Sequence, residues 1–264
     1  MGNKIALVTG ASDGIGLEFG DILAAQGYDL VLVARREDKL NEVSEKLSQT
    51  YDINCTVMAT DLSEPQAAQT LFQRTCDQNL QIDFLVNNAG LLHNGFFTEL
   101  SLAEQERMII VNVLALTSLS HLYANDMASR KKGHILNVAS LAAWMAIPNQ
   151  NVYAATKAYV LSFTQALADE LKAANSGVVA SALCPGYTAT KMMDNPDQGA
   201  KLSIAPNMMM SAKEVAEAGI KGCLAGKSAI VPGAANKVTA AITRLFSKAR
   251  LTRLVGSFYR NNMG

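Results

Sequence analysis

Short runs of β-branched and other apolar residues alternate along the chain with longer stretches in which apolar residues recur every three or four positions. The short runs predict strands and the longer stretches predict amphipathic helices. Two long helices are expected around Leu102–Ser129 and Val152–Ala174. The predicted strands are Ile5–Thr9, Leu30–Ala34, Asn54–Ala59, Phe84–Asn87, His134–Ala139, Val178–Leu183 and Ala229–Val231.

Several predicted strands are apolar on both faces, which is typical of a parallel sheet covered by helices on both sides. The order of elements therefore predicts an α/β fold, a Rossmann-like doubly wound parallel sheet of about seven strands, in a single domain. Ligands of such sheets bind beyond the carboxyl ends of the strands. The polar motifs of this chain fall at or just after those ends, or on the helix that follows.

Composition narrows the classes of partner and compartment. The formal net charge of the 264 residues is zero, so the chain as a whole predicts no nucleic-acid partner. Its cysteines, Cys55, Cys76, Cys184 and Cys223, lack the spacing of a disulfide framework or a zinc site, which favours a reducing compartment. Met1 leads directly into a strand, and an uncharged apolar run of spanning length is missing. We therefore expect a cytoplasmic protein without a signal peptide or a spanning helix.

The first predicted strand leads into the turn Thr9-Gly10-Ala11-Ser12-Asp13-Gly14-Ile15-Gly16 and then into a helix. Glycines let the backbone turn tightly and approach a pyrophosphate, and the start of a helix offers free N–H groups and a positive dipole end. A glycine-rich turn can also be merely a tight loop, but its place between strand and helix favours a dinucleotide site.

The end of the second strand bears on which dinucleotide is bound. A carboxylate at this position would bind a ribose 2′-hydroxyl, whereas an arginine would neutralise a 2′-phosphate. Here Ala34 is followed by Arg35, so NADP(H) is preferred over NAD(H). Alternatively, Arg35 and Arg36 form a solvated turn that pairs with the acidic residues after them.

Asp61, after the third strand, could contact the edge of the adenine. Alternatively, Asp61 or Ser63 could cap a helix that begins near Glu64.

Tyr153 and Lys157 are the main candidates for catalytic residues. Four residues on a helix advance about 400° and roughly 6 Å, so the two side chains project from one face. Any amphipathic helix produces this spacing, so the pair alone decides nothing. Four further elements accompany it in order: Asn87-Asn88-Ala89-Gly90, Asn112, Ser140 and Pro185-Gly186. The ordered set, with the glycine-rich turn, resembles the short-chain dehydrogenase/reductase family over roughly residues 4–233.

The resemblance implies a role for each catalytic candidate. Tyr153 would be the general acid/base, and Lys157 would lower its pKa and contact the nicotinamide ribose. Ser140 would hydrogen-bond the substrate oxygen, and Asn112 would hold a water in a proton relay. Taken singly, Asn112 could be a packing amide and Ser140 a turn residue.

The implied cofactor contacts lie after the strands, and Thr188 is chosen over Thr190 for the carboxamide. None of them requires a metal. They are Gly10, Ser12, Asp13, Gly14, Ile15, Gly16, Arg35, Asp61, Leu62, Asn87, Asn88, Ala89, Gly90, Tyr153, Lys157, Pro185, Gly186 and Thr188.

The expected activity is the NADP(H)-dependent interconversion of a hydrophobic ketone or aldehyde and its alcohol. A 3-oxoacyl thioester reductase is the alternative, and a non-catalytic dinucleotide sensor is disfavoured because Ser140, Tyr153 and Lys157 are all intact. By resemblance, residues 187–210 form a flap over the substrate, although core packing explains its methionines equally well. The candidate pocket residues are Leu91, Leu92, His93 at its rim, Trp144, Met145, Ile147, Met192, Met193, Met208, Met209 and Met210.

The two long helices bear on assembly. Both are apolar over more than one stripe, and by resemblance they pair across a dimer axis, so a homodimer or homotetramer is expected. We divide the chain into residues 1–235, the dinucleotide-binding and catalytic domain, and residues 236–264, a C-terminal extension. The extension has six Lys/Arg and no Asp/Glu, and predicts a basic amphipathic helix or helix pair. Packing on the parent domain or a partner subunit is favoured over contact with an anionic membrane.

Overall fold

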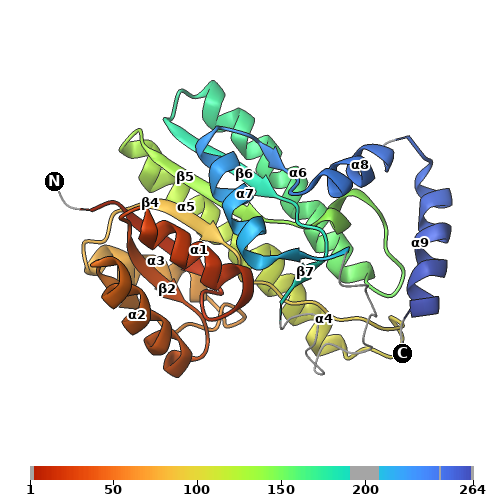
Figure 1. Ribbon diagram of the computed structural model, residues 1–264, viewed down its shortest axis with the longest axis horizontal. Helices are drawn as coiled ribbons and strands as arrows, with labels where there is room; N and C mark the ends of the chain where they lie inside the picture. Colours follow the sequence, from red (N-terminus) through yellow and green to blue (C-terminus); the bar gives the residue numbers. More distant parts are fainter. Residues whose placement is uncertain (1–2, 191–207, 244, 263–264) are drawn as a thin grey trace.

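The computed structural model describes residues 3–190, 208–243 and 245–262. Within these residues, seven parallel strands form a central sheet in the order β3-β2-β1-β4-β5-β6-β9 (Figure 1). The strands are β1 (Ile5–Thr9), β2 (Asp29–Val33), β3 (Cys55–Val57), β4 (Ile82–Asn87), β5 (Gly133–Val138), β6 (Val178–Leu183) and β9 (Ala229–Ile230). The predicted α/β class and single doubly wound sheet are confirmed.

All seven predicted strands are present, with ends displaced by two residues at most. β3 is shortened at both ends, from the predicted Asn54–Ala59 to Cys55–Val57, because this edge strand pairs only with β2. A separate pair, β7 (Thr188–Ala189) and β8 (Met210–Ser211), was not predicted, since two-residue strands show no periodicity.

Helices cover both faces of the sheet (Figure 1). On one face, α1 (Gly14–Ala25), α2 (Glu37–Tyr51) and α7 (Ala212–Leu224) bury apolar side chains against β1, β2 and β4. On the other face, α3 (Ala67–Asp77), α5 (Leu116–Ser129) and α6 (Asn151–Ala173) do the same. This two-sided burial explains why the strands read as continuous apolar runs.

The start of α3 differs from the prediction. The sequence suggested a helix from Glu64 capped by Asp61 or Ser63, but α3 begins at Ala67. The Asp61 carboxylate accepts hydrogen bonds from the backbone N–H and hydroxyl of Ser63, which form a turn ahead of the helix. Gln66 precedes α3 with φ 60°, a left-handed conformation that breaks the chain direction there.

The long predicted helix Leu102–Ser129 consists of three segments: α4 (Leu102–Ile109), the π-helical η1 (Ile110–Ala115) and α5. Its length and composition alone would allow it to cross a membrane. Half of its most apolar window is buried within the protein, however, as in a core helix that lies against a sheet. Within the described chain, it is the one helix of this kind.

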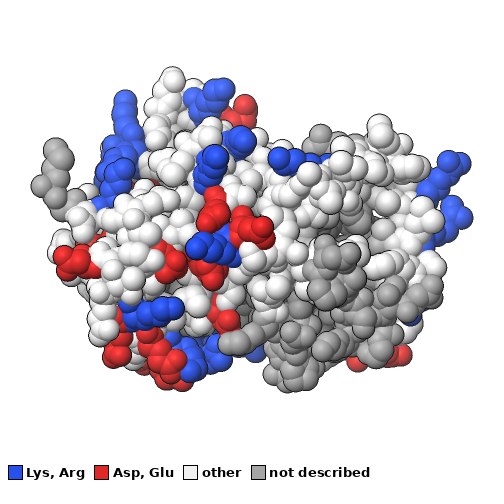
Figure 2. Space-filling view, viewed as in Figure 1, with Lys and Arg blue, Asp and Glu red and all other residues white. Residues whose placement is uncertain are grey.

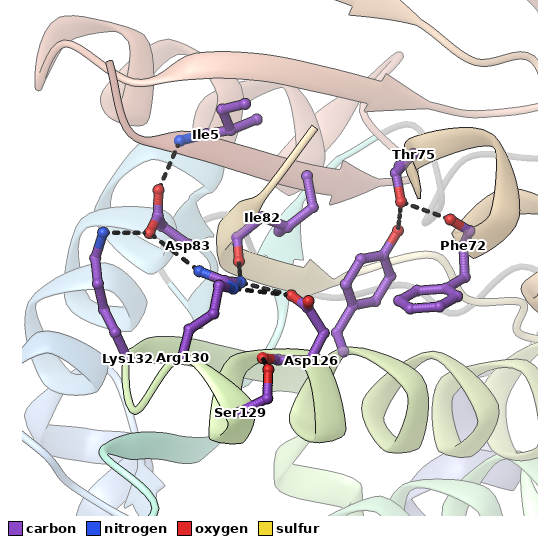
Figure 3. Close-up of polar contacts among 10 residues, drawn as sticks. Ile5, Phe72, Thr75, Ile82, Asp83, Asp126, Ser129, Arg130 and Lys132 are labelled. Carbon is purple, nitrogen blue, oxygen red and sulfur yellow. Dashed lines mark hydrogen bonds and ion pairs between the residues drawn. The ribbon is translucent and has the colours of Figure 1, made fainter. Parts of the chain in front are cut away.

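A cluster of charged residues around the buried Asp83 holds the amino ends of β1 and β4 together (Figure 3). The Asp83 carboxylate at the start of β4 accepts a hydrogen bond from the Ile5 N–H of β1 at 3.1 Å. Lys132 and Arg130, after α5, lie 2.6 Å and 3.7 Å from the other carboxylate oxygen. This cluster ties two strands to the end of a helix at the edge opposite the carboxyl ends of the strands.

The C-terminal extension forms two helices, α8 (Ala234–Ile242) and α9 (Lys248–Asn262). Of the two predicted forms, a single helix or a helix pair, the structure has the pair. α9 stands at one end of the molecule, where Figure 2 shows Lys and Arg on the surface. Its Val255 and Tyr259 pack against Ala142, Ile147 and Ala154. The extension therefore packs on the parent domain, one of the favoured alternatives.

Candidate active site

The direction of strand order reverses between β1 and β4, the position where doubly wound sheets bind ligands. The loops after these two strands open onto an outer cavity of about 770 Å³. Its predicted lining residues are Gly10, Ser12, Asp13, Gly14, Ile15, Arg35, Asp61, Leu62, Asn88, Ala89 and Gly90. The structure thus brings together eleven of the predicted cofactor residues from four separate loops.

The turn after β1 has the backbone that a phosphate cradle requires. Gly10 has φ +68°, and a Cβ there would lie 2.8 Å from the Asn88 side chain. A Cβ on Gly16 would overlap the carbonyl oxygen of Gly10, so only glycine allows α1 to start this close to the turn. Gly16 does not line the cavity but permits its shape. α1 then directs its N-terminus at the cavity, with Asp13 as N-cap. These residues fit a dinucleotide.

Charged groups surround the far end of the outer cavity. Arg35 and Arg36 both line it, and neither forms an ion pair with a carboxylate of the described residues, so the predicted solvated pairing does not occur there. Arg107 of α4 lies 3.0 Å from the Asp61 carboxylate. Burial alone would raise the pKa of Asp61, but the hydrogen bonds from Ser63 and the charges of Arg107 and Arg35 lower it overall. Asp61 therefore faces the cavity as a carboxylate.

Arg107 was missed by sequence reasoning, although a signal existed. Val111, one helical turn later, also lines the outer cavity, and this four-residue spacing places the two residues on one face of the helix that contains the predicted Asn112. The other lining residues that were not predicted as cofactor contacts are Val33, Ala34, Arg36, Thr60, Leu91 and Thr190.

An inner cavity of about 430 Å³ adjoins the outer one, and Ile15, Asn88, Gly90 and Thr190 border both. Six further predicted catalytic or cofactor residues line the inner cavity: Ser140, Tyr153, Lys157, Pro185, Gly186 and Thr188. The two cavities thus meet at the glycine-rich turn, the loop after β4 and Thr190, while Ser140, Tyr153 and Lys157 line the inner cavity alone.

Ser140 and Tyr153 come from different elements and meet in the inner cavity. Ser140 follows β5 and caps the short 3-10 helix η2 (Leu141–Trp144), accepting a hydrogen bond from the Ala142 N–H at 3.1 Å. Tyr153 lies in the first turn of α6. Burial raises the pKa of the Tyr153 phenol, and its hydrogen bond with Ser140 opposes this rise without cancelling it.

Lys157 is buried one turn after Tyr153. Its Nζ donates a hydrogen bond to the Val138 carbonyl at the end of β5, at 2.8 Å, and lies 5.7 Å from the centre of the Tyr153 ring. Burial lowers the pKa of Lys157 to about 8. The expectation that Lys157 would hold the pKa of Tyr153 below its ordinary value is not met in the protein alone, because burial dominates the Tyr153 pKa.

Asn112 occupies the π-helical segment η1 and is fully buried. Its side chain exchanges two hydrogen bonds with the backbone of Leu91, at 2.8 and 2.9 Å, and donates a third to Thr156 at 3.1 Å. A Cβ on Gly90 would lie 3.3 Å from Asn112 Oδ1 and 3.5 Å from Lys157 Nζ, so both atoms lie on the side of Gly90 where a side chain would project. π-helical turns are often found at functional sites.

Two predicted residues lie elsewhere. Asn87 points into the core, where its amide donates to Ser120 at 3.1 Å and to Asn137 at 2.8 Å. The cofactor contact predicted for Asn87 is therefore wrong, and its neighbour Asn88 lines the cavities instead. The difference follows from the strand, whose successive side chains point to opposite faces. Trp144 packs beside Cys184 in a separate apolar cluster and does not line the inner cavity.

The other pocket candidates divide between the cavities and the core. Leu92, Met145 and Ile147 line the inner cavity, whereas Leu91 lines the outer one. His93 is buried beside Glu104, at 3.3 Å, and borders neither cavity.

The methionines of the predicted flap do not line the inner cavity where they are described. Met210 packs against the core and Met208 is exposed, so core packing, the alternative explanation, applies to Met210. Met192 and Met193 lie outside the described residues.

The two threonines of the flap segment differ in position. Thr188 lines only the inner cavity and donates to the Gly186 carbonyl at 3.2 Å. Thr190 borders both cavities and approaches Gly14. Thr188 was chosen over Thr190 as the contact of the carboxamide. Of the two, however, it is Thr190 that lies at the boundary between the cavities.

The C-terminal helix α9 supplies part of the inner cavity, which the sequence did not predict. Four of its residues line the cavity: Leu254, Val255, Phe258 and Tyr259. Across the part of the chain that the structure describes, no group of three or more His, Cys, Asp or Glu residues is arranged to hold a metal ion.

Comparisons with known proteins agree with this geometry. A family model described as short chain dehydrogenase matches residues 4–201, and the chain belongs to that family. It is an oxidoreductase that acts on CH–OH and C=O groups. The 7beta-hydroxysteroid dehydrogenase of Collinsella aerofaciens is 29% identical over 97% of this chain and 96% of that protein. The very-long-chain 3-oxoacyl-CoA reductase of Rattus norvegicus is 34% identical over 71% of this chain and only 60% of that protein.

Solved structures resemble the whole chain. One of 7beta-hydroxysteroid dehydrogenase has a TM-score of 0.85 at 26% identity and covers 96% of both chains. A short-chain dehydrogenase from Sphingobium yanoikuyae in complex with NADPH has a TM-score of 0.80 at 28% identity, over 92% of this chain and 94% of that one. Another from Burkholderia phymatum, in complex with NAD, has a TM-score of 0.80 at 25% identity, over 90% and 92%.

Proposed function

We propose that the protein is an NADP(H)-dependent oxidoreductase that interconverts a hydrophobic ketone or aldehyde and the corresponding alcohol. One observation carries the proposal: Ser140, Tyr153 and Lys157 line one inner cavity, and this cavity adjoins the outer cavity lined by the glycine-rich turn. A nicotinamide cofactor, when bound, supplies or accepts the hydride of such a reaction.

Ser140 and Tyr153 act on the substrate oxygen. In reduction, both hydroxyls donate hydrogen bonds to the carbonyl and so stabilise the charge that develops on its oxygen. Tyr153 then gives its phenolic proton to that oxygen, and in oxidation it accepts the proton of the alcohol. The raised pKa of Tyr153 keeps the phenol protonated near neutral pH, which suits carbonyl reduction.

Lys157 and Asn112 support the proton transfer. The Lys157 ammonium, fixed to the Val138 carbonyl, stabilises the negative charge left on Tyr153 by the transfer. Asn112 and the Gly90 backbone lie beside Lys157, and we assign to Asn112 the holding of a water through which Tyr153 and Lys157 are reprotonated.

The preference for NADP(H) rests on Arg35 and Arg36. Both guanidinium groups line the outer cavity after β2, where a ribose 2′-phosphate would lie, and neither forms an ion pair within 4 Å of a carboxylate in the described part of the chain. Arg guanidinium binds phosphate through paired, charge-assisted hydrogen bonds. One similar structure contains NADPH and another NAD, so the assignment depends on the arginines of this chain.

The substrate proposal rests on the inner cavity, whose lining is mostly aliphatic and aromatic. Its volume of about 430 Å³ falls within the range of pockets for drug-sized ligands. The near full-length similarity to a hydroxysteroid dehydrogenase supports a bulky apolar substrate. The similarity to a 3-oxoacyl-CoA reductase supports a second candidate, a 3-oxoacyl thioester.

A panel of ketones, aldehydes, alcohols and 3-oxoacyl thioesters, each assayed with NADPH and NADH, tests the proposal. We expect turnover of apolar ketones with NADPH in excess of NADH. Turnover of small charged substrates alone would contradict the substrate assignment, and a strong preference for a thioester over its free ketone would favour the second candidate.

A further inference from the structure

The far wall of the inner cavity comes from the C-terminal extension. Leu254, Val255, Phe258 and Tyr259 recur on α9 at one-, three- and four-residue intervals and all line the cavity. Of these, Tyr259 is only 5% exposed, whereas Leu254 remains 67% exposed. α9 therefore presents one edge to the cavity and the rest of its surface to the outside.

Two contacts hold α9 against the domain. The Tyr259 hydroxyl lies 2.9 Å from the Tyr187 hydroxyl and donates to Gln150 Oε1 at 3.3 Å. Gln150 in turn donates to Asn94, so a buried polar chain runs from α9 to the loop after β4. A Cβ on Gly256 would lie 2.8 Å from Pro148 Cγ, so this glycine allows α9 to approach the loop before α6 closely.

The Tyr259 contact lies close to the reaction site. Tyr187 and Tyr259 line the same cavity as Tyr153. The charge of an ionised Tyr187 would raise the pKa of both Tyr153 and Tyr259. Val255 and Tyr259 also share an apolar cluster with Tyr153 and Ile147. The position of α9 thus sets how much space lies between Tyr153 and the far wall.

We propose that α9, held by Tyr259, is the wall that selects substrates by the apolar body they carry beyond the reacting carbonyl, and that Tyr259 is a specificity-determining positioning residue. The proposal rests on the function proposed above. A ketone whose apolar body reaches α9 gains the contacts with Val255 and Phe258, whereas a small ketone bound at Ser140 and Tyr153 does not. Loss of the Tyr259 hydroxyl should therefore weaken binding of the extended ketone and leave the small one unaffected.

The test compares cyclohexanone with 4-phenylcyclohexanone, which share the reacting ring and differ by one apolar group. With Tyr259→Phe, we expect KM for 4-phenylcyclohexanone to rise about fivefold to tenfold, because α9 loses the hydrogen bonds that hold it against the domain and a buried hydrogen bond contributes a factor of about this size. Its kcat and the kcat/KM of cyclohexanone should change less than about twofold. Tyr51→Phe is the matched control, since the Tyr51 hydroxyl bonds Asp21 on the far side of the molecule.

A second variant keeps Tyr259 intact. Val255→Ala removes apolar contact from the wall, so kcat/KM for 4-phenylcyclohexanone should again fall while that for cyclohexanone is retained. Equal losses for both ketones, or no change for 4-phenylcyclohexanone in either variant, would overturn the proposal. Failure of the wild-type protein to reduce any ketone would instead contradict the proposed function itself.

Discussion

The ammonium nitrogen of Lys157 lies 5.7 Å from the centre of the Tyr153 ring and is fixed by a 2.8 Å hydrogen bond to the Val138 carbonyl. The lysine thus connects the end of β5 to the first turns of α6. Because its side chain is only 4% exposed, a charge is held in the interior beside the proposed proton donor. Such a charge costs stability in exchange for function.

Replacing Lys157 with methionine should change how stability depends on pH. Burial lowers the pKa of Lys157 to about 8, below its ordinary 10.5. Below pH 8 both the folded and the unfolded state carry the proton, and burial of the charge costs about 3 kcal/mol for a shift of this size. As pH rises from 8 to 10.5, the unfolded state binds more protons, so the unfolding free energy of the wild type rises relative to the variant.

Urea denaturation of both proteins from neutral to alkaline pH measures this difference. The exposed Lys46 of α2 provides the control, since Lys46→Met removes a charge that is already solvated. A difference between wild type and Lys157→Met that stays constant with pH would contradict the buried charge.

Substituting Arg35 with glutamate should reverse the cofactor preference. The change removes a cation from the proposed 2′-phosphate site and adds a negative charge that repels the phosphate. The kcat/KM with NADPH should therefore fall about tenfold to a hundredfold. Activity with NADH should be retained or rise. Lys46→Glu makes the same charge change elsewhere on the surface and should affect neither cofactor. Steady-state kinetics with both cofactors decide, and equal losses would argue against a role in selection.

Asp83→Asn should destabilise the protein without affecting the reaction. The substitution leaves Arg130 and Lys132 facing a neutral amide in the cluster of Figure 3; because Lys132 is exposed and Arg130 keeps its contact with Asp126, the expected cost is about 1–3 kcal/mol. Since Asp83 starts β4 at the edge opposite the cavities, kcat and KM at low temperature should be unchanged. Asp169→Asn, an exposed position of α6, should change stability by less than about 0.5 kcal/mol. Unfolding free energies from urea titration provide the comparison.

Leu114→Arg should disrupt the expected homodimer or homotetramer. Leu114, Ile109 and Tyr159 are 59%, 46% and 40% exposed. Thr117 of α5, three residues after Leu114 of η1, is hydrogen-bonded to Tyr159 of α6 at 3.0 Å, so the exposed Leu114 and Tyr159 lie on neighbouring helices of the same face. Sedimentation of the wild type should show an oligomer and that of the variant a monomer. Leu224→Arg, on α7 across the sheet, is the matched control, and a monomeric wild type would refute the prediction.

The sequence predicted the elements that local pattern determines. Strand positions follow from apolar runs, and Ser140 and Tyr153 were found because each follows a strand or begins a helix in a known order. Asn87 and Asn88 show the limit: both stand in the same motif, and only the sheet decides which faces the core.

Contacts between distant segments could not be predicted in the same way. Arg107 reaches Asp61 from a helix 46 residues later, and Tyr259 reaches Gln150 across 109 residues. The apolar spacing of the extension indicated a helix but not the surface it covers. The burial that raises the pKa of Tyr153 in the protein alone was likewise not predicted, because it is a property of the packed cavity and not of the spacing to Lys157.

The most direct test of the account is the activity of Tyr153→Phe, which removes one hydroxyl and retains the ring. If Tyr153 is the proton donor, kcat/KM for carbonyl reduction with NADPH should fall about 10²-fold to 10⁴-fold while NADPH still binds, as followed by its fluorescence. Carbonyl reduction at the wild-type rate by this variant would contradict the proposed mechanism.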